Sequence, residues 1–166
     1  LNIDPGASLM TPFNFDHPAF TPTDKSETDE PLNSLETKNK YPQTFSISLQ
    51  AFQLAREHLN SVGLELIDTK MENGIEGDRF TTLADELFTP DSSRFCEKSA
   101  IKLGEDPPFL DKEIARQEAV RLWGSGGRTP LQFDRDIIDK LSRTYRSIFS
   151  RITGSTLEYF QREHLE

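Results

Sequence analysis

The chain has 166 residues, 34% of them hydrophobic, with a mean hydropathy of −0.60 and a formal net charge of −9 at pH 7. This length fits one ordinary domain with a modest core. The acidic balance, without a basic run or basic helix face, disfavours nucleic acid as a partner, and no apolar run approaches the roughly 18 residues that a membrane span needs.

The single cysteine, Cys96, excludes an internal disulfide bond and fits a reducing compartment. Nothing resembles a signal peptide, so we expect a cytoplasmic protein. The histidines are scattered and form no zinc-ligand spacing, so a metal here would be a hard cation held by carboxylates. The chain begins with Leu1 rather than methionine, which fits a processed, trimmed or partial chain.

Residues 1–42 are rich in Pro, Asn, Asp, Thr and Ser and keep no apolar period, which predicts an extended, loop-rich lead-in. Within it, Phe20–Asn33 (FTPTDKSETDEPLN) is most simply a solvated linker. The sharper alternative is a mobile loop that closes over a site, with Lys25 at its charged tip. Residues 43–166 are predicted to form the folded α/β domain.

Apolar residues recur at helical spacing over residues 43–62, which predicts a helix that Gly63 ends. Leu64–Met71 then alternates in the manner of a strand, and Arg79–Glu86 is a second alternating run. Turn-forming residues, including Asn73-Gly74, lie between the two runs. A β-hairpin of these runs is the simplest arrangement.

The predicted hairpin gathers charged side chains. A period of two puts Asp68, Lys70 and Glu72 on one face, and Asp85 near the end of the returning strand lies across from them. Mg²⁺ is usually bound by one or two carboxylates together with phosphates and water. Lys70 could neutralise a phosphate or a developing oxyanion. Acids beside a hairpin are more often solvated surface, so spacing alone favours the surface interpretation.

The stretch Thr89–Arg94 (TPDSSR) is predicted to be a loop with an Asx-type turn. Asp91 could accept hydrogen bonds from an amine nucleophile, and Arg94 offers a planar fork for a carboxylate or phosphate. The loop is expected to continue from Lys98 to Pro108.

Two helices are predicted in the last third of the chain. Asp111–Leu122 carries Lys112 and Arg116 as surface neighbours, and Leu131–Thr153 has the strongest apolar stripe, which is expected to pack in the core. Between them, residues 124–127 (GSGG) lack the lysine and the spacing of a phosphate-binding loop. The predicted fold class is α+β, a small and mainly antiparallel sheet packed by helices.

Three segments carry a family resemblance: DTKMENG at 68–74, LADELFTPDSSRF at 83–95 and FTPTDK at 20–25. They resemble the signature segments of the phosphoribosylaminoimidazole-succinocarboxamide synthases, the SAICAR synthetases of purine biosynthesis. DKEIAR at 111–116 is similar to a further family segment. The resemblance covers the chain from residue 16 onward and implies the carboxy-terminal lobe of that fold.

The resemblance implies ATP and Mg²⁺ as cofactors and assigns a role to each site residue. Glu72 and Asp85 would hold the Mg²⁺ of MgATP. Lys70, Asp91 and Arg94 would contact carboxyaminoimidazole ribonucleotide, with Lys70 and Asp91 as the catalytic pair and Asp91 near the amine.

Four further residues would complete the substrate site by the same resemblance. Lys112 and Arg116 would add positive charge for a phosphate or carboxylate, and Lys25 and Asp29 would lie on a loop that closes over the site. The implied reaction activates the ribonucleotide carboxylate as an acyl phosphate with ATP, after which the amine of aspartate attacks it.

The chain also departs from the family pattern. Asn73 replaces the phenylalanine of the E-F-G segment, Cys96 replaces a tryptophan, and the histidine of an H-D-E-N stretch is missing near Asp29. The family's amino-terminal lobe, with its glycine-containing nucleotide loop and lysine, has no counterpart in these residues. A second chain that supplies this lobe is therefore an expected partner.

Three hypotheses follow. The first is a ligase that joins aspartate to carboxyaminoimidazole ribonucleotide and needs an amino-terminal ATP-binding lobe. The second is a non-catalytic module of the same fold that binds nucleotide or anion. The third is a structural domain whose acidic face is solvent coat, and the motifs rank it last.

Overall fold

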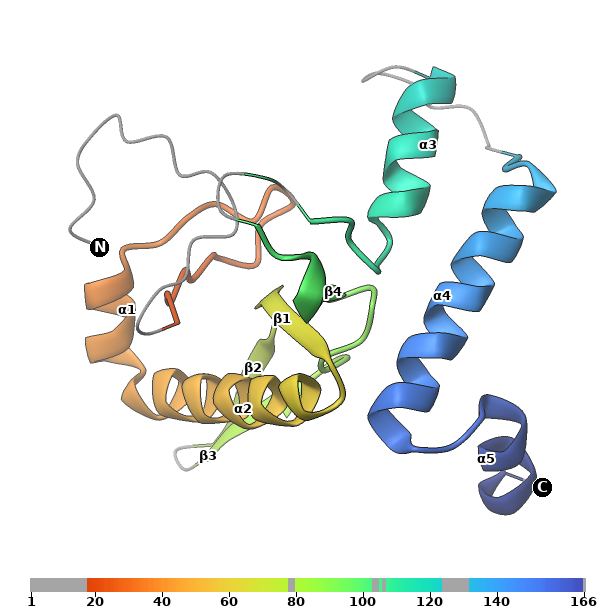
Figure 1. Ribbon diagram of the computed structural model, residues 1–166. Helices are drawn as coiled ribbons and strands as arrows, with labels where there is room; N and C mark the ends of the chain where they lie inside the picture. Colours follow the sequence, from red (N-terminus) through yellow and green to blue (C-terminus); the bar gives the residue numbers. More distant parts are fainter. Residues whose placement is uncertain (1–17, 78–79, 103–104, 106, 124–131, 166) are drawn as a thin grey trace.

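The computed structural model describes residues 18–77, 80–102, 105, 107–123 and 132–165. Helices α1 and α2 lie on one side of the strands, and α3, α4 and α5 lie on the other (Figure 1). The elements are α1 (Ser34–Lys40), α2 (Pro42–Ser61), β1 (Leu64–Thr69), β2 (Glu72–Glu76), β3 (Phe80–Ala84), β4 (Ser93–Glu97), the 3-10 helix η1 (Lys98–Ala100), α3 (Glu113–Trp123), α4 (Arg135–Thr153) and α5 (Leu157–His164). The predicted link at 124–127 lies outside the described residues.

The described strands form two antiparallel pairs, β1 with β4 and β2 with β3. The predicted hairpin between Leu64–Met71 and Arg79–Glu86 is therefore wrong. Asn73-Gly74, which was assigned to a turn, lies inside β2 and pairs with Leu83 and Thr82. Local turn chemistry is a weak determinant of strand pairing because burial of cross-strand side chains decides which partner is favoured.

Strand β4 occupies residues that were predicted to be loop. Phe95 and Cys96 are fully buried, and Ser93 is 4% exposed. Leu64 and Leu66 of β1 are equally buried, and Leu66 pairs with Phe95. The two strands therefore pair because each supplies apolar side chains to the same core, although TPDSSR carries no strand period of its own.

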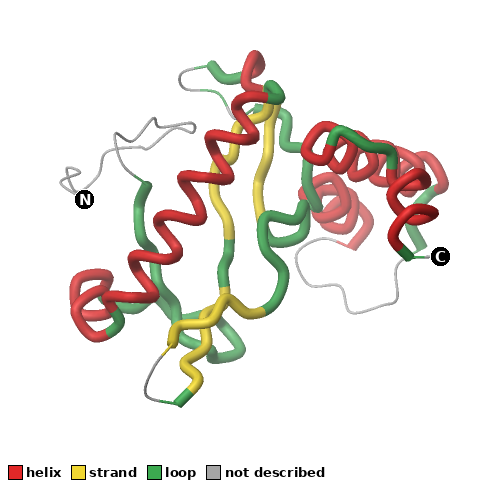
Figure 2. The backbone as a smooth tube through the Cα atoms, turned by 90° about the horizontal axis from the view of Figure 1, so that it is seen from below, coloured by secondary structure: helices red, strands yellow, loops and turns green. Residues whose placement is uncertain are grey.

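The core lies where α2 covers the β1–β4 pair and α4 meets its edge (Figure 2). Helix α2 confirms the helix predicted over 43–62. Its side of the core is completed by partly buried Phe52 and Ala55. The fully packed cluster is small, which agrees with the low hydrophobic fraction. Its members are Leu59, Leu64, Leu66, Phe95 and Ile148.

Arg151 of α4 fixes the turn between α2 and β1. Its guanidinium donates to the carbonyl of Val62 at 2.8 Å (Nη2) and to Glu97 Oε1 at 2.5 Å (Nη1). Gly63 has φ +79, and a Cβ there would lie 3.0 Å from Arg151 Nη2. A side chain at Gly63 would therefore be strained and would crowd this arginine.

Helix α4 ends at Gly154 with φ +70, as predicted, but its stripe is only partly a core face. Ile148 is 2% exposed and Ile152 packs on the core, whereas Ile138 is 52% exposed. Only the last turns of α4 reach the β1–β4 pair. The expectation that the whole stripe packs in the core is therefore wrong for its first half.

Helix α1 lies within the predicted lead-in, where no regular structure was expected. Asn33 caps it, because its side-chain oxygen accepts hydrogen bonds from the backbone N–H of Leu35 and Glu36, each at 3.0 Å. No residue of α1 is buried. The helix therefore depends on its cap and on its contact with α2 rather than on an apolar period.

The α+β class with small antiparallel pairs and packing helices is confirmed. No helix within the described ranges is both long enough and apolar enough to cross a membrane. The division of the chain at residue 42 stays a prediction.

Cys96 should resist thiol reagents until the protein unfolds. Burial, and then the charges of Glu65 and Glu97, raise the pKa of its thiol to about 11. An unfolded cysteine ionises near pH ~8.5, so the unfolded chain loses its proton first, and the free energy of unfolding should fall as the pH rises from about 9 towards 11. Labelling kinetics and urea unfolding at several pH values measure both effects.

The matched variant is Cys96→Ala, which should lack this loss of stability at alkaline pH. Rapid labelling of Cys96 under native conditions at pH 8 would contradict the expectation.

Candidate functional site

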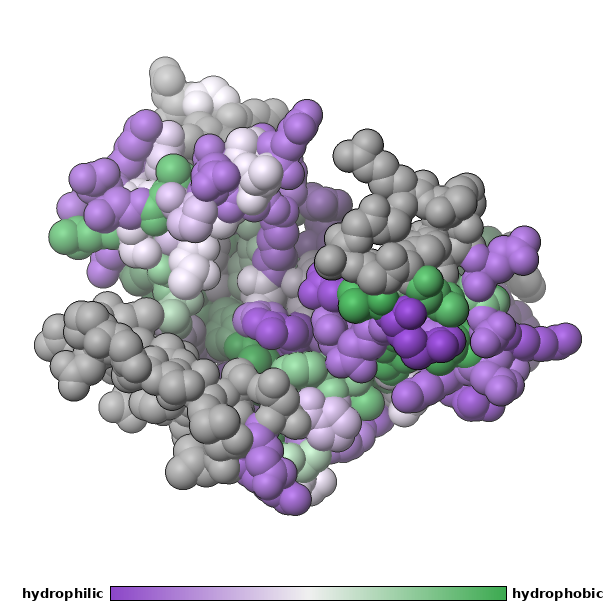
Figure 3. Space-filling view, turned by 90° about the horizontal axis from the view of Figure 1, so that it is seen from above, coloured by the Kyte–Doolittle hydropathy of each residue, from purple (hydrophilic) through white to green (hydrophobic). Residues whose placement is uncertain are grey.

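A polar cavity of about 520 Å³ opens beside the two strand pairs. Figure 3 shows hydrophilic side chains around the hollow on the upper face of the molecule. Three parts of the chain line the cavity: the β1–β2 connection, the segment from β3 into β4, and the start of α3. The lining residues are Asp68, Lys70, Glu72, Asp85, Glu86, Asp91, Ser92, Ser93, Arg94, Asp111, Lys112, Glu113 and Arg116.

A bulge in β1 lies between the buried Leu66 and Asp68, which lines the cavity. Leu66 pairs with Phe95 and Asp68 pairs with Arg94, so the ladder passes over Ile67. The bulge lets core residues and site residues follow each other on one short strand. Arg94 Nε donates to Asp68 Oδ2 at 2.8 Å, which holds the guanidinium at the cavity wall. The hydrogen bond with Asp68 is the main cause that raises the pKa of Arg94.

The loop of residues 23–31, which precedes α1, contacts two residues that line this cavity. Thr23 bridges to Pro31, and the Asp24 carboxylate accepts from the backbone N–H of Ser26 and Glu30, each at 3.0 Å. This closed loop is set in shape by local hydrogen bonds rather than by burial. It therefore has a defined geometry at its tip.

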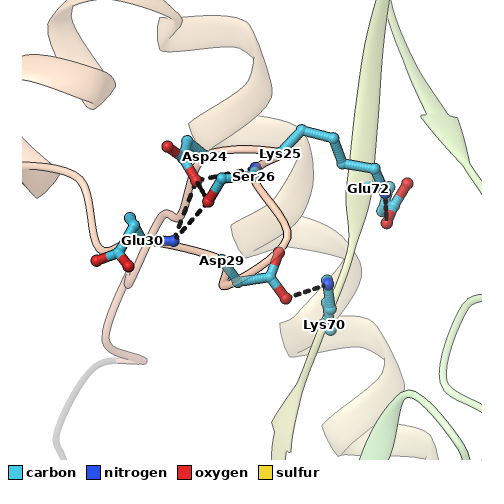
Figure 4. Close-up of polar contacts among 7 residues, drawn as sticks. All are labelled: Asp24, Lys25, Ser26, Asp29, Glu30, Lys70 and Glu72. Carbon is cyan, nitrogen blue, oxygen red and sulfur yellow. Dashed lines mark hydrogen bonds and ion pairs between the residues drawn. The ribbon is translucent and has the colours of Figure 1, made fainter.

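Two ion pairs join this loop to the floor of the cavity (Figure 4). Lys25 Nζ contacts Glu72 Oε1, and Lys70 Nζ lies 2.8 Å from Asp29 Oδ2. The hydrogen bond that Lys70 donates to Asp29 is the largest cause that raises the pKa of Lys70, so this ammonium stays charged. The loop and the floor of the cavity thus each supply one lysine and one carboxylate to the two ion pairs.

Glu72 and Asp85 come together through the β2–β3 pair. Glu72 pairs with Ala84, and Asp85 follows directly with φ +63. Both carboxylates line the cavity. One carboxylate on β2 and one directly after β3 supply hard oxygen donors, which fit a Mg²⁺ that completes its shell with phosphate and water. No set of three His, Cys, Asp or Glu side chains in the described part of the chain is arranged to hold a metal alone.

Asn73, where the family pattern has phenylalanine, is imperfectly satisfied. Its Nδ2 lies 3.3 Å from Ser48 Oγ, and its buried Oδ1 has no hydrogen-bond partner in the described structure. A buried acceptor without a partner costs stability. This cost falls where β2 meets α2, next to Glu72.

The turn before β4 presents Asp91. Ser92 and Ser93 donate backbone N–H groups to Thr89 O at 3.2 and 2.9 Å, so the turn is closed on itself. Tyr145 of α4 donates its hydroxyl to Asp91 Oδ1 at 2.8 Å. The backbone around Asp91 is therefore held by the turn, and the Asp91 carboxylate is held by a distant helix.

The start of α3 and the two residues before it contribute positive charge and one buried acid. Lys112 and Arg116 line the cavity, and Arg116 Nη1 is 3.1 Å from Glu113. Asp111 is only 2% exposed, its Oδ1 accepts from the N–H of Glu113 at 2.6 Å, and its Oδ2 has no partner among the described residues. Burial is the main cause that raises the pKa of Asp111.

The structure brings together every residue that the sequence proposed for the site. Seven of them line the cavity, and the other two, Lys25 and Asp29, reach it through their ion pairs. Sequence reasoning assigned no role in the site to Asp111, which lines the cavity, or to Tyr145, which contacts Asp91. Asp111 precedes a helix, where an aspartate signals a cap, and Tyr145 was included in an apolar stripe.

Comparison with known proteins gives one consistent result. The model of the family described as SAICAR synthetase matches residues 7–140. The phosphoribosylaminoimidazole-succinocarboxamide synthase of Cupriavidus necator is 32% identical over 166 aligned positions, which cover 92% of this chain and 55% of that protein.

Two solved structures show the same fold. The SAICAR synthase of Saccharomyces cerevisiae, solved in complex with SAICAR, matches with a TM-score of 0.73 at 27% identity, over 86% of this chain and 48% of that one. A type-2 SAICAR synthetase in complex with ADP matches with a TM-score of 0.54 at 24% identity, over 77% and 46% of the two chains. The chain thus spans about half the length of the relatives that it matches.

Proposed function

Since the chain belongs to the SAICAR synthetase family, we propose that it forms the ribonucleotide-binding part of an ATP-dependent ligase that joins aspartate to carboxyaminoimidazole ribonucleotide. The observation that carries this proposal is that one cavity is lined by three cations, Lys70, Arg94 and Lys112, and by the carboxylates of Glu72 and Asp85. ADP and SAICAR are bound by structural relatives, which supports the same ligand classes here.

Glu72 and Asp85 would hold the magnesium ion of the nucleotide. When bound, Mg²⁺ neutralises phosphate charge and so favours phosphoryl transfer. Glu72 now contacts Lys25, so Lys25 would have to leave this carboxylate before a cation takes its place. We therefore expect the contact of loop 23–31 with Glu72 to break when a cation binds this carboxylate.

The remaining charges suit the substrate. Lys70 would stabilise negative charge as the ribonucleotide carboxylate attacks the γ-phosphate and ADP leaves. Arg94 offers two parallel donors to an anionic group, and Lys112 and Arg116 add positive charge along the same wall. Asp91 would accept a hydrogen bond from an amine. In the second half of the reaction the aspartate amine attacks the acyl carbon and phosphate leaves.

The complete reaction would need residues beyond those in this sequence. We propose an amino-terminal nucleotide-binding lobe, on the same or another chain, as the partner, and the cytoplasm as the expected location. The alternative function is a binding module without turnover. The unpartnered Oδ1 of Asn73, next to Glu72, favours it.

Mixing the chain with the amino-terminal lobe of a relative should release ADP when ATP, Mg²⁺, aspartate and the ribonucleotide are all present. Coupled-enzyme detection of ADP measures the rate, and omission of each component in turn is the control. Binding of ribonucleotide without ADP release would support the module. Absence of both, with both parts folded by circular dichroism, would refute the family function for this chain.

A further inference from the structure

Tyr145 connects two cavities of different character. Its ring lines an apolar groove between α4 and the start of the TPDSSR turn, together with Phe88, Phe149 and Ile152. Its hydroxyl leaves that groove and donates to Asp91 Oδ1 at 2.8 Å. Asp91 lines the polar cavity and Tyr145 does not. The tyrosine therefore acts on the site from outside it.

The hydrogen bond has a fixed direction. Burial, and then the hydrogen bond and charge of Asp91, raise the pKa of the Tyr145 phenol well above its ordinary value, so the hydroxyl remains the donor. Among the described residues, Tyr145 alone hydrogen-bonds to the Asp91 side chain. One carboxylate oxygen is thus occupied, and no other residue that the structure describes donates to the second, which can serve as an acceptor.

The turn alone does not fix this carboxylate. The hydrogen bonds among Thr89, Ser92 and Ser93 hold the backbone and hydroxyls of the turn, but none reaches Asp91. An exposed aspartate on a closed turn still rotates about its side-chain bonds. A rigid helix that holds one oxygen removes this freedom, and such supporting contacts determine how well a polar group is oriented.

We propose that Tyr145 is a positioning residue for amine recognition: it holds Asp91 Oδ1 so that Oδ2 accepts a hydrogen bond from the amine of the ribonucleotide. This inference rests on the proposed function, because it assumes that the cavity binds that substrate. Tyr145 does not touch the ligand. Its effect should therefore depend on whether the ligand carries the amine.

Tyr145→Phe should raise the dissociation constant of carboxyaminoimidazole ribonucleotide about three- to tenfold, as expected for the loss of one hydrogen bond to a charged group at a partly exposed site. The same variant should leave the affinity for the analogous ribonucleotide without the amine unchanged. In the Asp91→Asn background, Tyr145→Phe should add little, because the two residues act as a unit. Calorimetry with each ligand measures all of these values.

Tyr159→Phe is the matched control, since Tyr159 lies on α5 and is 52% exposed. Equal losses for both ligands would show a merely structural role and overturn the inference, as would an unchanged affinity for the amine-bearing ligand. If the unmodified chain binds neither ribonucleotide, the proposed function itself fails, and the inference fails with it.

Discussion

Asp85→Asn should weaken the binding of MgADP at least about tenfold in the mixture with an amino-terminal lobe, since loss of even an outer partner of a metal ligand costs about 10- to 100-fold. Asp85 has φ +63, a conformation that asparagine tolerates better than other side chains. The substitution therefore removes the charge and keeps the backbone. Calorimetry with and without Mg²⁺ measures the effect.

The expected loss should depend on the metal. Without Mg²⁺ the variant and the parent should bind ADP alike, because Asp85 would act only through the cation. Asp139→Asn on the exposed side of α4 is the matched control and should bind as the parent does. An Asp85→Asn protein with unchanged MgADP affinity would remove Asp85 from the metal site.

Phe95→Ala should lower the free energy of unfolding by about 3–5 kcal/mol, the usual cost of truncating a buried phenylalanine. Phe95 is fully buried and pairs with Leu66 in the centre of the small core. Domains of this size have only about 5–15 kcal/mol to lose. Urea unfolding followed by circular dichroism measures the difference.

Two other variants serve as comparisons for the loss of stability in Phe95→Ala. Phe95→Leu refills most of the volume and should cost clearly less, and Leu54→Ala, at a side chain 68% exposed, should change stability by no more than about 0.5 kcal/mol. If Phe95→Ala were as mild as Leu54→Ala, the assignment of β4 to the core would be wrong.

Helix α2 and the site residues were predictable from sequence for different reasons. Helix α2 follows from an apolar period and the glycine that ends it. The site residues follow from short segments such as TPDSSRF, whose residues resemble a family signature in both type and order. The apolar period and the signature segments are both local in the sequence, so neither depends on which strands pair.

Pairing itself was not predictable in the same way. Strand β4 has a hydroxyl, a charge, an aromatic and a thiol in succession, so its burial comes from the partner strand and not from its own pattern. Asp111 and Tyr145 were missed for a related reason. Tyr145 acquires its role from Asp91, far away in the chain, and Asp111 acquires its role from burial in the cavity wall, whereas a local reading assigns them to a helix stripe and a helix cap.

The bulge at Ile67 makes the site sensitive to chain length and not only to residue type. On its amino-terminal side Leu66 meets Phe95, and on its carboxy-terminal side Asp68 meets Arg94. Deleting Ile67 would let the same pairs form in a regular ladder and would remove the bend that the bulge gives the strand. Insertions and deletions between Leu66 and Asp68 should therefore be rarer among functional descendants of this chain than substitutions at Ile67.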